Sequence, residues 1–292
     1  FNTRRDDEIR LTNGPSYESH SVSFLLSKNF NSGVFTDGGS VGLRFGYAFT
    51  DSDNNRNVGS STATSSFDVS AAFDRQDPAV STSNFETRHN ITASVFFREE
   101  FIEDFSTSLG IFFRAREGRP YSLTFDGGGV FNDSSSGNDN ALLYIPTGIS
   151  DPNLSPDSDF TAVADLLNYL NTSEVGEQCD FELGESIARN TCRNDWVFDL
   201  DMRISQELPF LGSLTGLVQD RIELFADFDN VLNFIDDGAN ISRARGDFVD
   251  LVDGDVDPNG LYVIDGFNPD DRNFVSTTSS IWRIQVGVRY EF

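Results

Sequence analysis

Hydrophobic and polar residues alternate along seven stretches of the chain, residues 19–28, 40–50, 88–98, 106–116, 195–207, 221–230 and 279–292. In the last stretch, one set of alternate positions is apolar and runs from Trp282 to Phe292. The intervening set is polar or small and runs from Arg283 to Glu291. A β-strand projects successive side chains to opposite faces. Each stretch therefore predicts a strand with one apolar and one polar face.

The lengths of these stretches and of the links between them favour a membrane barrel. Each stretch has roughly the 9–11 residues of a tilted membrane-crossing strand, whereas strands of soluble sandwiches usually have about five or six. Short links (residues 29–39, 99–105 and 208–220) alternate with long ones (51–87, 126–194 and 234–278). Short turns at one end and long loops at the other are typical of outer-membrane barrels.

We therefore predict an all-β fold, an antiparallel transmembrane β-barrel segment of about seven long strands with short periplasmic turns and long extracellular loops. Closed single-chain bacterial barrels normally have an even number of strands, so seven strands predict an incomplete barrel. The alternative is a soluble β-sandwich, in which a second sheet would cover the apolar faces.

Composition narrows the class of function. The formal net charge is -26, from 47 Asp and Glu against 21 Lys and Arg, which argues against a nucleic-acid partner because phosphates require a basic surface. The sequence contains neither a Gly-x-Ser-x-Gly motif nor a His cluster with metal-ligand spacing, so we do not expect an enzyme. Two cysteines, Cys179 and Cys192, suit a disulfide in an oxidising compartment, with two free thiols as the alternative.

The charged members of the polar set are expected to face the barrel lumen. They are Asp199, Asp201, Arg203, Glu223, Asp227, Asp229, Arg283, Arg289 and Glu291. Across the last strand pair, Arg283, Arg289 and Glu291 are predicted to lie next to Glu223, Asp227 and Asp229. Such pairs would form a structural ladder or, alternatively, a docking surface for a plug domain.

Two features of the long loops stand out. Residues 159–170 predict a short helix with Asp159 as its cap and an apolar stripe of Phe160, Val163, Leu167 and Leu170. Asp253, Asp255, Asp257 and Asn259 offer oxygen atoms at alternate positions, as a calcium ligand set would. Pro258 stands where an EF-hand loop has Gly, and no terminal Glu follows. An ordinary acidic turn is therefore the favoured interpretation.

Several motifs resemble TonB-dependent outer-membrane receptors. The stretches RNTCRNDWVFDLDMRISQELP, ELFADFDNVLNF with its Asn230 and Asn233, and WRIQVGVRYEF are similar to the last strands of that family. The stretches LSKNFNSG, NFETRHNITASVFF, GRPYSLTFDGGG and GNDNALLYIP are similar to its Oar-like subgroup. The set occurs in the expected order over nearly the whole chain.

The resemblance implies a barrel of about 22 strands around a plug domain, of which this chain is the C-terminal third without the plug. It implies TonB-dependent transport of an unidentified solute across the bacterial outer membrane. The expected partners are outer-membrane lipid, the plug and remaining strands, TonB through the plug, and the barrel-assembly machinery, which would read Tyr290 and Phe292. No cofactor is expected, and a calcium ion in a long loop is only the less favoured alternative given above.

Two other functions remain open at this stage. One is a self-contained porin-like barrel, which would need a further strand near residues 65–73. The other is a secreted, acidic, calcium-dependent adhesion module.

Overall fold

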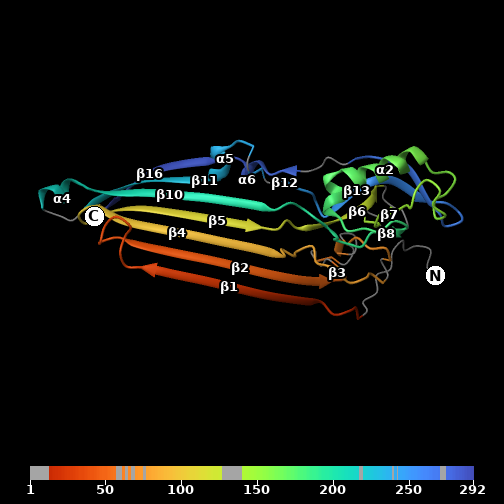
Figure 1. The fold of residues 1–292 in the computed structure, drawn as a ribbon, viewed down its shortest axis with the longest axis horizontal. Helices are drawn as coiled ribbons and strands as arrows, with labels where there is room; N and C mark the ends of the chain where they lie inside the picture. Colours follow the sequence, from red (N-terminus) through yellow and green to blue (C-terminus); the bar gives the residue numbers. More distant parts are fainter. Residues whose placement is uncertain are drawn as a thin grey trace.

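The computed structural model describes residues 13–56, 61–62, 65–66, 70–74, 77–126, 140–216, 220–238, 240–241, 243–269 and 274–292. The molecule is elongated (Figure 1). A long sheet runs along most of its length, and shorter strands and helices gather at one end. We call this gathering, built from the described parts of the three long links, the loop domain.

Seven long antiparallel strands make up the main sheet. They are β1 (Glu18–Phe30), β2 (Ser40–Asn54), β4 (His89–Ile102), β5 (Phe105–Arg116), β10 (Val197–Pro209), β11 (Arg221–Asp229) and β16 (Arg283–Glu291). Their order in the sheet follows their order in the chain, and a short strand, β3 (Ser81–Thr82), adds to β2. The predicted all-β antiparallel fold is confirmed. Among the described residues the sheet does not close, since β1 and β16 are its two edges.

The three short links lie at the end of the sheet away from the loop domain, which we call the turn end (Figure 1). The β4–β5 turn contains Asp104 in the left-handed region, with φ 66°. The β10–β11 link contains α4 (Leu211–Thr215), which ends on Gly216 at φ 71°. A left-handed residue at this position terminates a helix, and glycine adopts it without steric cost.

The loop domain has its own small sheets. Its strands are β6 (Pro120–Asp126), β7 (Tyr144–Ile145), β8 (Glu185–Ser186), β9 (Cys192–Arg193), β12 (Arg243–Ala244), β13 (Phe248–Val256), β14 (Tyr262–Phe267) and β15 (Phe274–Val275). The largest of these sheets has the order β14-β13-β6-β9, and β13 runs parallel to β6. The helices of the long links are α2 (Phe160–Thr172) and α3 (Glu174–Gln178) in the gathering itself, and α5 (Val231–Ile235) and α6 (Thr277–Ser280), which lie beside the ends of β11 and β16 (Figure 1).

The hydrophobic core of the chain lies in the loop domain. Most of its fully buried members come from β6, β13, β14, α2 and the segment around β7. The predicted helix is confirmed as α2, and the Asp159 side chain accepts hydrogen bonds from the Thr161 and Ala162 amides. The predicted apolar stripe was partly wrong, because Leu166 is fully buried whereas Phe160 is 41% exposed.

A disulfide joins Cys179, next to α3, to Cys192 in β9. A bridge of this kind typically adds about 2–4 kcal/mol by restricting the unfolded chain. No additional long strand is found near residues 65–73: Ser65 and Phe73 lie outside any described strand, Ala72 forms only an isolated bridge with Ala141, and residues 67–69 are not described. None of the described helices has the length and apolar character needed to cross a membrane.

Candidate functional site

One face of the main sheet is apolar across all seven strands. The register places apolar residues opposite each other from strand to strand, as in the pairs Val22–Phe49, Leu43–Val95, Phe113–Leu200 and Phe228–Ile284. Many of these side chains are uncovered: Val286 is 76% exposed and Val288 is 68% exposed. A soluble sandwich would need a second sheet on this face, and the described part of the chain does not provide one.

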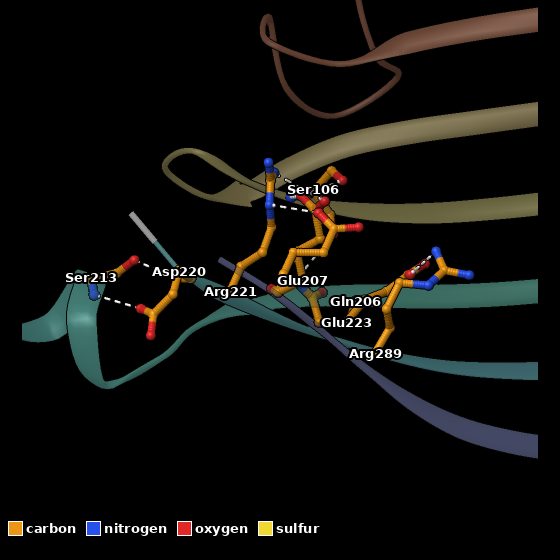
Figure 2. Close-up of polar contacts among 9 residues, drawn as sticks. Ser106, Gln206, Glu207, Ser213, Asp220, Arg221, Glu223 and Arg289 are labelled. Atoms are coloured by element: carbon orange, nitrogen blue, oxygen red, sulfur yellow. Dashed lines mark hydrogen bonds and ion pairs between the residues drawn. The ribbon is translucent and has the colours of Figure 1, made fainter. Parts of the chain in front are cut away.

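The opposite face of β10, β11 and β16 carries a row of ion pairs. Arg289 Nη1 lies 2.8 Å from Glu223 Oε2, and Arg203 Nη1 lies 3.0 Å from Asp227 Oδ1. Nearer the loop domain, Arg283 Nε is 3.3 Å from Asp229 Oδ2. Figure 2 shows the Arg289–Glu223 pair together with the contacts at the turn end. The predicted neighbours in this row therefore come together across adjacent strands.

The prediction for the last strand pair was wrong in two details. Glu291 pairs with Arg221, whose Nε lies 3.2 Å from Glu291 Oε2. Asp227 lies opposite Gln285 in β16, and its arginine partner, Arg203, comes from β10 on the other side. Strand register decides both results, because a side chain meets the residue directly opposite it on each neighbouring strand.

Phe225 lies in the middle of this polar row. The Arg203 guanidinium stands 4.5 Å from the centre of the Phe225 ring, and the Arg289 guanidinium 5.9 Å. Gly287, opposite Phe225 in the register, makes room for the ring, because a Cβ atom at this position would clash with it. The ring therefore positions both arginines through cation–π contacts.

The two remaining predicted charges lie further toward the loop domain. Asp201 Oδ1 accepts a hydrogen bond from the Asn230 amide at 2.9 Å, and Asp199 lies opposite Arg114 in the register. Elsewhere on this face, a hollow of about 610 Å³ includes Arg44, Arg98 and Arg203 in its lining. The polar face therefore combines satisfied ion pairs with a concave region that contains arginines.

Three carboxylates that the sequence did not single out organise the turn end. Glu99 accepts hydrogen bonds from the Val34 and Thr36 amides at 2.5 and 2.9 Å and thereby fixes the β1–β2 link. Glu207 accepts from the Ser106 amide at 2.9 Å and lies 3.3 Å from Arg221 (Figure 2). The amides that Glu99 and Glu207 bind lie at least 63 positions away in the chain, so no local sequence signal identifies these two carboxylates.

Asp220 is the third of these carboxylates, and it links α4 to the C-terminal strand. It accepts hydrogen bonds from the Ser213 and Gly212 amides at 2.7 and 3.1 Å (Figure 2). Burial alone would raise the pKa of Asp220, but these hydrogen bonds outweigh burial and leave the pKa below its usual range. The Tyr290 hydroxyl also donates to Asp220, at 3.1 Å.

The C-terminal aromatic residues have different surroundings. Besides its bond to Asp220, the Tyr290 ring contacts Phe210 edge-on at 5.3 Å between ring centres. The Phe292 ring stacks beside Tyr290 at 5.7 Å, and the residue is 92% exposed. Tyr290 is thus fixed to the turn end, whereas Phe292 projects from it and is available for contact.

Asn230 is the corresponding junction at the other end of β11. Its backbone is left-handed, with φ 55°. Its Oδ1 accepts from Asn240 Nδ2 at 2.7 Å, and its Nδ2 donates to the Ser279 carbonyl at 3.2 Å. Asn233, the second asparagine of the motif, donates through Nδ2 to the Asp237 carbonyl at 3.0 Å. The two asparagines therefore shape the exit from the sheet.

The oxygen ligands considered for calcium, the less favoured interpretation of residues 253–259, are divided between a strand and a turn. Asp253 and Asp255 belong to β13, and Asp257 begins the turn to β14. Asp257 Oδ1 accepts from the Asn259 and Leu261 amides at 2.8 and 2.9 Å, as in an ordinary acidic turn. The described residues contain no group of three or more His, Cys, Asp or Glu side chains that is arranged to hold a metal ion.

Comparisons of the chain with protein-family models, with curated proteins and with solved structures give no match.

Proposed function

We propose that the chain is the C-terminal part of the barrel of a TonB-dependent outer-membrane receptor of the Oar-like kind, and that it takes part in transport of a solute across that membrane. The observation that carries the proposal is the continuous apolar face of seven long, sequentially paired strands, which no described element covers. The assignment to this family is supported in addition by the motifs in the last strands and long loops, which resemble those of the family.

Physical reasoning supports lipid as the cover of this face. Each Å² of apolar surface left in water costs about 25 cal/mol, and soluble monomers rarely expose apolar patches larger than a few hundred Å². Seven strands of exposed Val, Leu, Ile and Phe side chains far exceed scattered single exposures. Hydrocarbon chains would remove this cost without a second layer of protein.

Aromatic residues lie near both ends of the strands. Trp196 and Trp282 precede β10 and β16 at the loop-domain end, and Phe234 contacts Trp282 at 5.2 Å between ring centres. Phe35 and Phe101 lie 6.2 Å apart at the turn end. Two such bands agree with the aromatic girdles of membrane barrels at the two lipid–water boundaries.

In this function, the two faces and the loop domain have separate roles. The apolar face contacts lipid, and the polar face lines the lumen and meets the plug of the full-length protein. The short turns lie in the periplasm, and the loop domain lies outside the cell and captures the solute. The edges of β1 and β16 pair with strands that are not part of this chain. The chain contributes binding and a channel wall, and we assign it no catalysis.

A pair of adjacent substitutions tests the lipid contact. Val286→Lys puts a charge on the apolar face near the middle of β16, and we expect it to destabilise the inserted sheet by about 2–4 kcal/mol. Gln285→Lys is the matched control. It puts the same charge on the polar face, opposite Asp227, and we expect little change. The measurement is the fraction of each full chain that inserts into lipid vesicles and becomes protected from protease.

The outcomes separate the three functions. Equal behaviour of the two variants, with a chain that stays in solution without detergent, would refute lipid contact and favour the adhesion module. Insertion followed by ion conductance from the isolated chain in a planar bilayer would favour a self-contained porin-like barrel. Insertion that becomes efficient only when the upstream part of the gene product is supplied agrees with a receptor barrel.

A further inference from the structure

A line of arginines crosses the polar face of the main sheet from the turn end to the loop domain. The antiparallel register groups the polar positions of β2, β4, β5 and β10 into rows, and five successive rows contain one arginine each. From the turn end, these residues are Arg98, Arg203, Arg44, Arg114 and Arg116. Successive rows are two residues apart, which is roughly 7 Å along a strand. We call these five residues the arginine line.

Most of the arginine line has no neutralising partner. Arg203 pairs with Asp227 and Glu223. The side chains of the other four arginines form no ion pair and no hydrogen bond in the part of the chain that the structure describes. On β2, β4 and β5, the polar positions of the five rows contain no Asp or Glu, and Asp199 on β10 faces Arg114 without an ion pair.

The composition of the chain makes this line unusual. The formal net charge is -26, so carboxylates are plentiful, yet they are missing from the rows where they would neutralise the arginines. Like charges on neighbouring strands repel and destabilise a sheet. An uncompensated line of cations in such an acidic chain therefore indicates an anionic partner for this face.

The hollow on the polar face lies over the part of the line nearest the turn end. Its volume is about 610 Å³, within the usual range of about 300–1,000 Å³ for small-molecule sites. Its lining includes Arg44, Arg98 and Arg203 against one carboxylate, Glu223. Glu223 is already held by Arg289 at 2.8 Å (Figure 2). The residues of the hollow therefore leave an excess of positive charge.

Small residues keep the hollow open and supply further hydrogen-bond donors. Gly42 and Gly110 lie on either side of Phe96 in the register, where larger side chains would fill the space. Ser108 and Ser205 lie opposite each other in one row and also line the hollow. Hydroxyl and guanidinium groups donate hydrogen bonds, and the oxygens of carboxylates and phosphates accept them. The hollow therefore matches an oxyanion.

We propose that the polar face binds a small solute with several carboxylate or phosphate groups, held in the hollow by Arg44 and Arg98 and approached along Arg114 and Arg116 from the loop domain. Arg and Lys side chains that line a pore select anions. With a spacing of roughly 7 Å, a solute with several oxyanion groups contacts neighbouring rows at once. The acidic surface elsewhere does not prevent its approach, because exposed charges are screened beyond roughly 8 Å at physiological salt.

The first experiment measures binding to the whole chain in detergent micelles by calorimetry. Pyrophosphate represents phosphates, citrate represents carboxylates, and sucrose is the uncharged control. We expect saturable binding of an anion and none of sucrose, with an affinity that falls at least about tenfold between about 0.05 and 0.5 M salt. Binding of both anions supports a general oxyanion site, whereas binding of only one assigns the site to phosphates or to carboxylates.

Protein variants locate the binding. Arg44→Gln combined with Arg98→Gln should weaken anion binding at least about tenfold. Both side chains are exposed and form no bond within the sheet, so the melting temperature should stay unchanged. Arg243→Gln is the matched control, because Arg243 is an exposed arginine of β12 outside the arginine line. It should change the affinity less than about twofold.

The same titration of the full-length protein distinguishes a solute from an acidic surface of the plug domain. A solute site still binds the anion there, and Arg44→Gln still weakens the binding. Loss of anion binding in the full-length protein would mean that the plug covers these arginines, and it would overturn the proposal.

Two results from the isolated chain would also overturn it: no saturable binding of either anion up to about 10 mM, or unchanged binding by the double variant. Only passage of the solute along the line rests on the proposed function. A chain that inserts into lipid yet binds neither anion disproves this inference alone. A chain that binds an anion through Arg44 and Arg98 and stays in water without detergent disproves the transport function alone.

Discussion

The main sheet and the loop domain use apolar residues in opposite ways. In the loop domain, Leu251 and Leu166 are completely buried among other side chains of the same chain. In the sheet, Val286 and Val288 are mostly exposed although they belong to regular strands. The chain therefore contains one region whose apolar side chains are buried by the chain itself. In the other region, the described part of the chain leaves the apolar side chains uncovered.

The sequence patterns of the two regions differ for the same reason. Residues 141–145 are apolar without interruption and are all buried, as expected for a segment packed on both sides. The long strands alternate, as expected for an antiparallel sheet with one apolar and one polar face. The comparison teaches that strict alternation over long strands marks a sheet with one apolar face, whereas an uninterrupted apolar run marks the compact core beside it.

The largest difference is expected from deletion of leucine side-chain atoms in the two regions. Leu166→Ala should lower the free energy of unfolding of the loop domain by about 2–5 kcal/mol, because it removes buried contacts and leaves a cavity among fixed neighbours. Leu224→Ala, on the apolar face of β11, should cost less. If lipid covers this face, as proposed, fluid hydrocarbon refills the space there and the cavity contribution is missing. Hydrogen exchange of each region in lipid vesicles measures the two effects separately.

An equal or larger cost at Leu224 would break the comparison. It would mean that Leu224 packs against fixed protein atoms rather than lipid, as in a sandwich or a tight oligomer.

Acid is expected to weaken the loop domain. Burial alone would raise the pKa of Asp151, but hydrogen bonds from the Thr147 and Asn153 amides, at 2.6 and 2.8 Å, outweigh it and lower the pKa. The hydrogen bond from the Leu261 amide is the main cause of the lowered pKa of Asp257, against the opposing effect of burial.

A lowered folded-state pKa means that the ionised carboxylate stabilises the fold. This stability is fully present above the unfolded pKa, about 3.9 for Asp, and is lost as the pH falls through the lower folded value. The melting temperature of the loop domain, followed by circular dichroism of its tyrosines, should be level above about pH 5 and fall below about pH 4. Asp151→Asn should lower the melting temperature at neutral pH and make its decrease at acid pH smaller. A melting temperature that rises on acidification would contradict the assigned sign.

The sheet was largely predictable from the sequence. All seven strands, their antiparallel order and their two faces follow from period-two alternation and from the unequal links, because each signal lies within ten or so neighbouring residues. The Asp159 cap and the helix that follows it are similarly local. The disulfide partners followed from there being only two cysteines.

The loop domain and the detailed site were not predictable in the same way. The parallel pairing of β13 with β6 joins residues more than a hundred positions apart. Nothing in the sequence of either strand identifies the other as its partner. The Glu291–Arg221 pair depends on a register that the alternation leaves free. The uninterrupted apolar run at residues 141–145 was the one sequence signal of a separate core.

The smallest expected effect concerns the ion pairs on the polar face. Arg289 is more than half exposed in this chain and lies 2.8 Å from Glu223. Arg289→Gln should therefore cost only about 0.2–1 kcal/mol, the usual value for exposed cross-strand pairs. A double-mutant cycle with Glu223→Gln, measured as unfolding in detergent, gives the coupling energy of the pair directly. The coupling should fall as salt is added, because exposed charges are screened.

The same cycle sharpens the comparison when it is repeated in the full-length protein. If the polar face only holds the strands together, the coupling stays small and sensitive to salt there as well. If a plug domain covers the pair, both charges lose water. Removing one of them then leaves the other buried and unpaired, at a cost of about 3–5 kcal/mol for a fully buried pair. A large, salt-insensitive coupling already present in the isolated chain would contradict an open polar face. It would mean that water is excluded from the ion pair even when no plug domain is present.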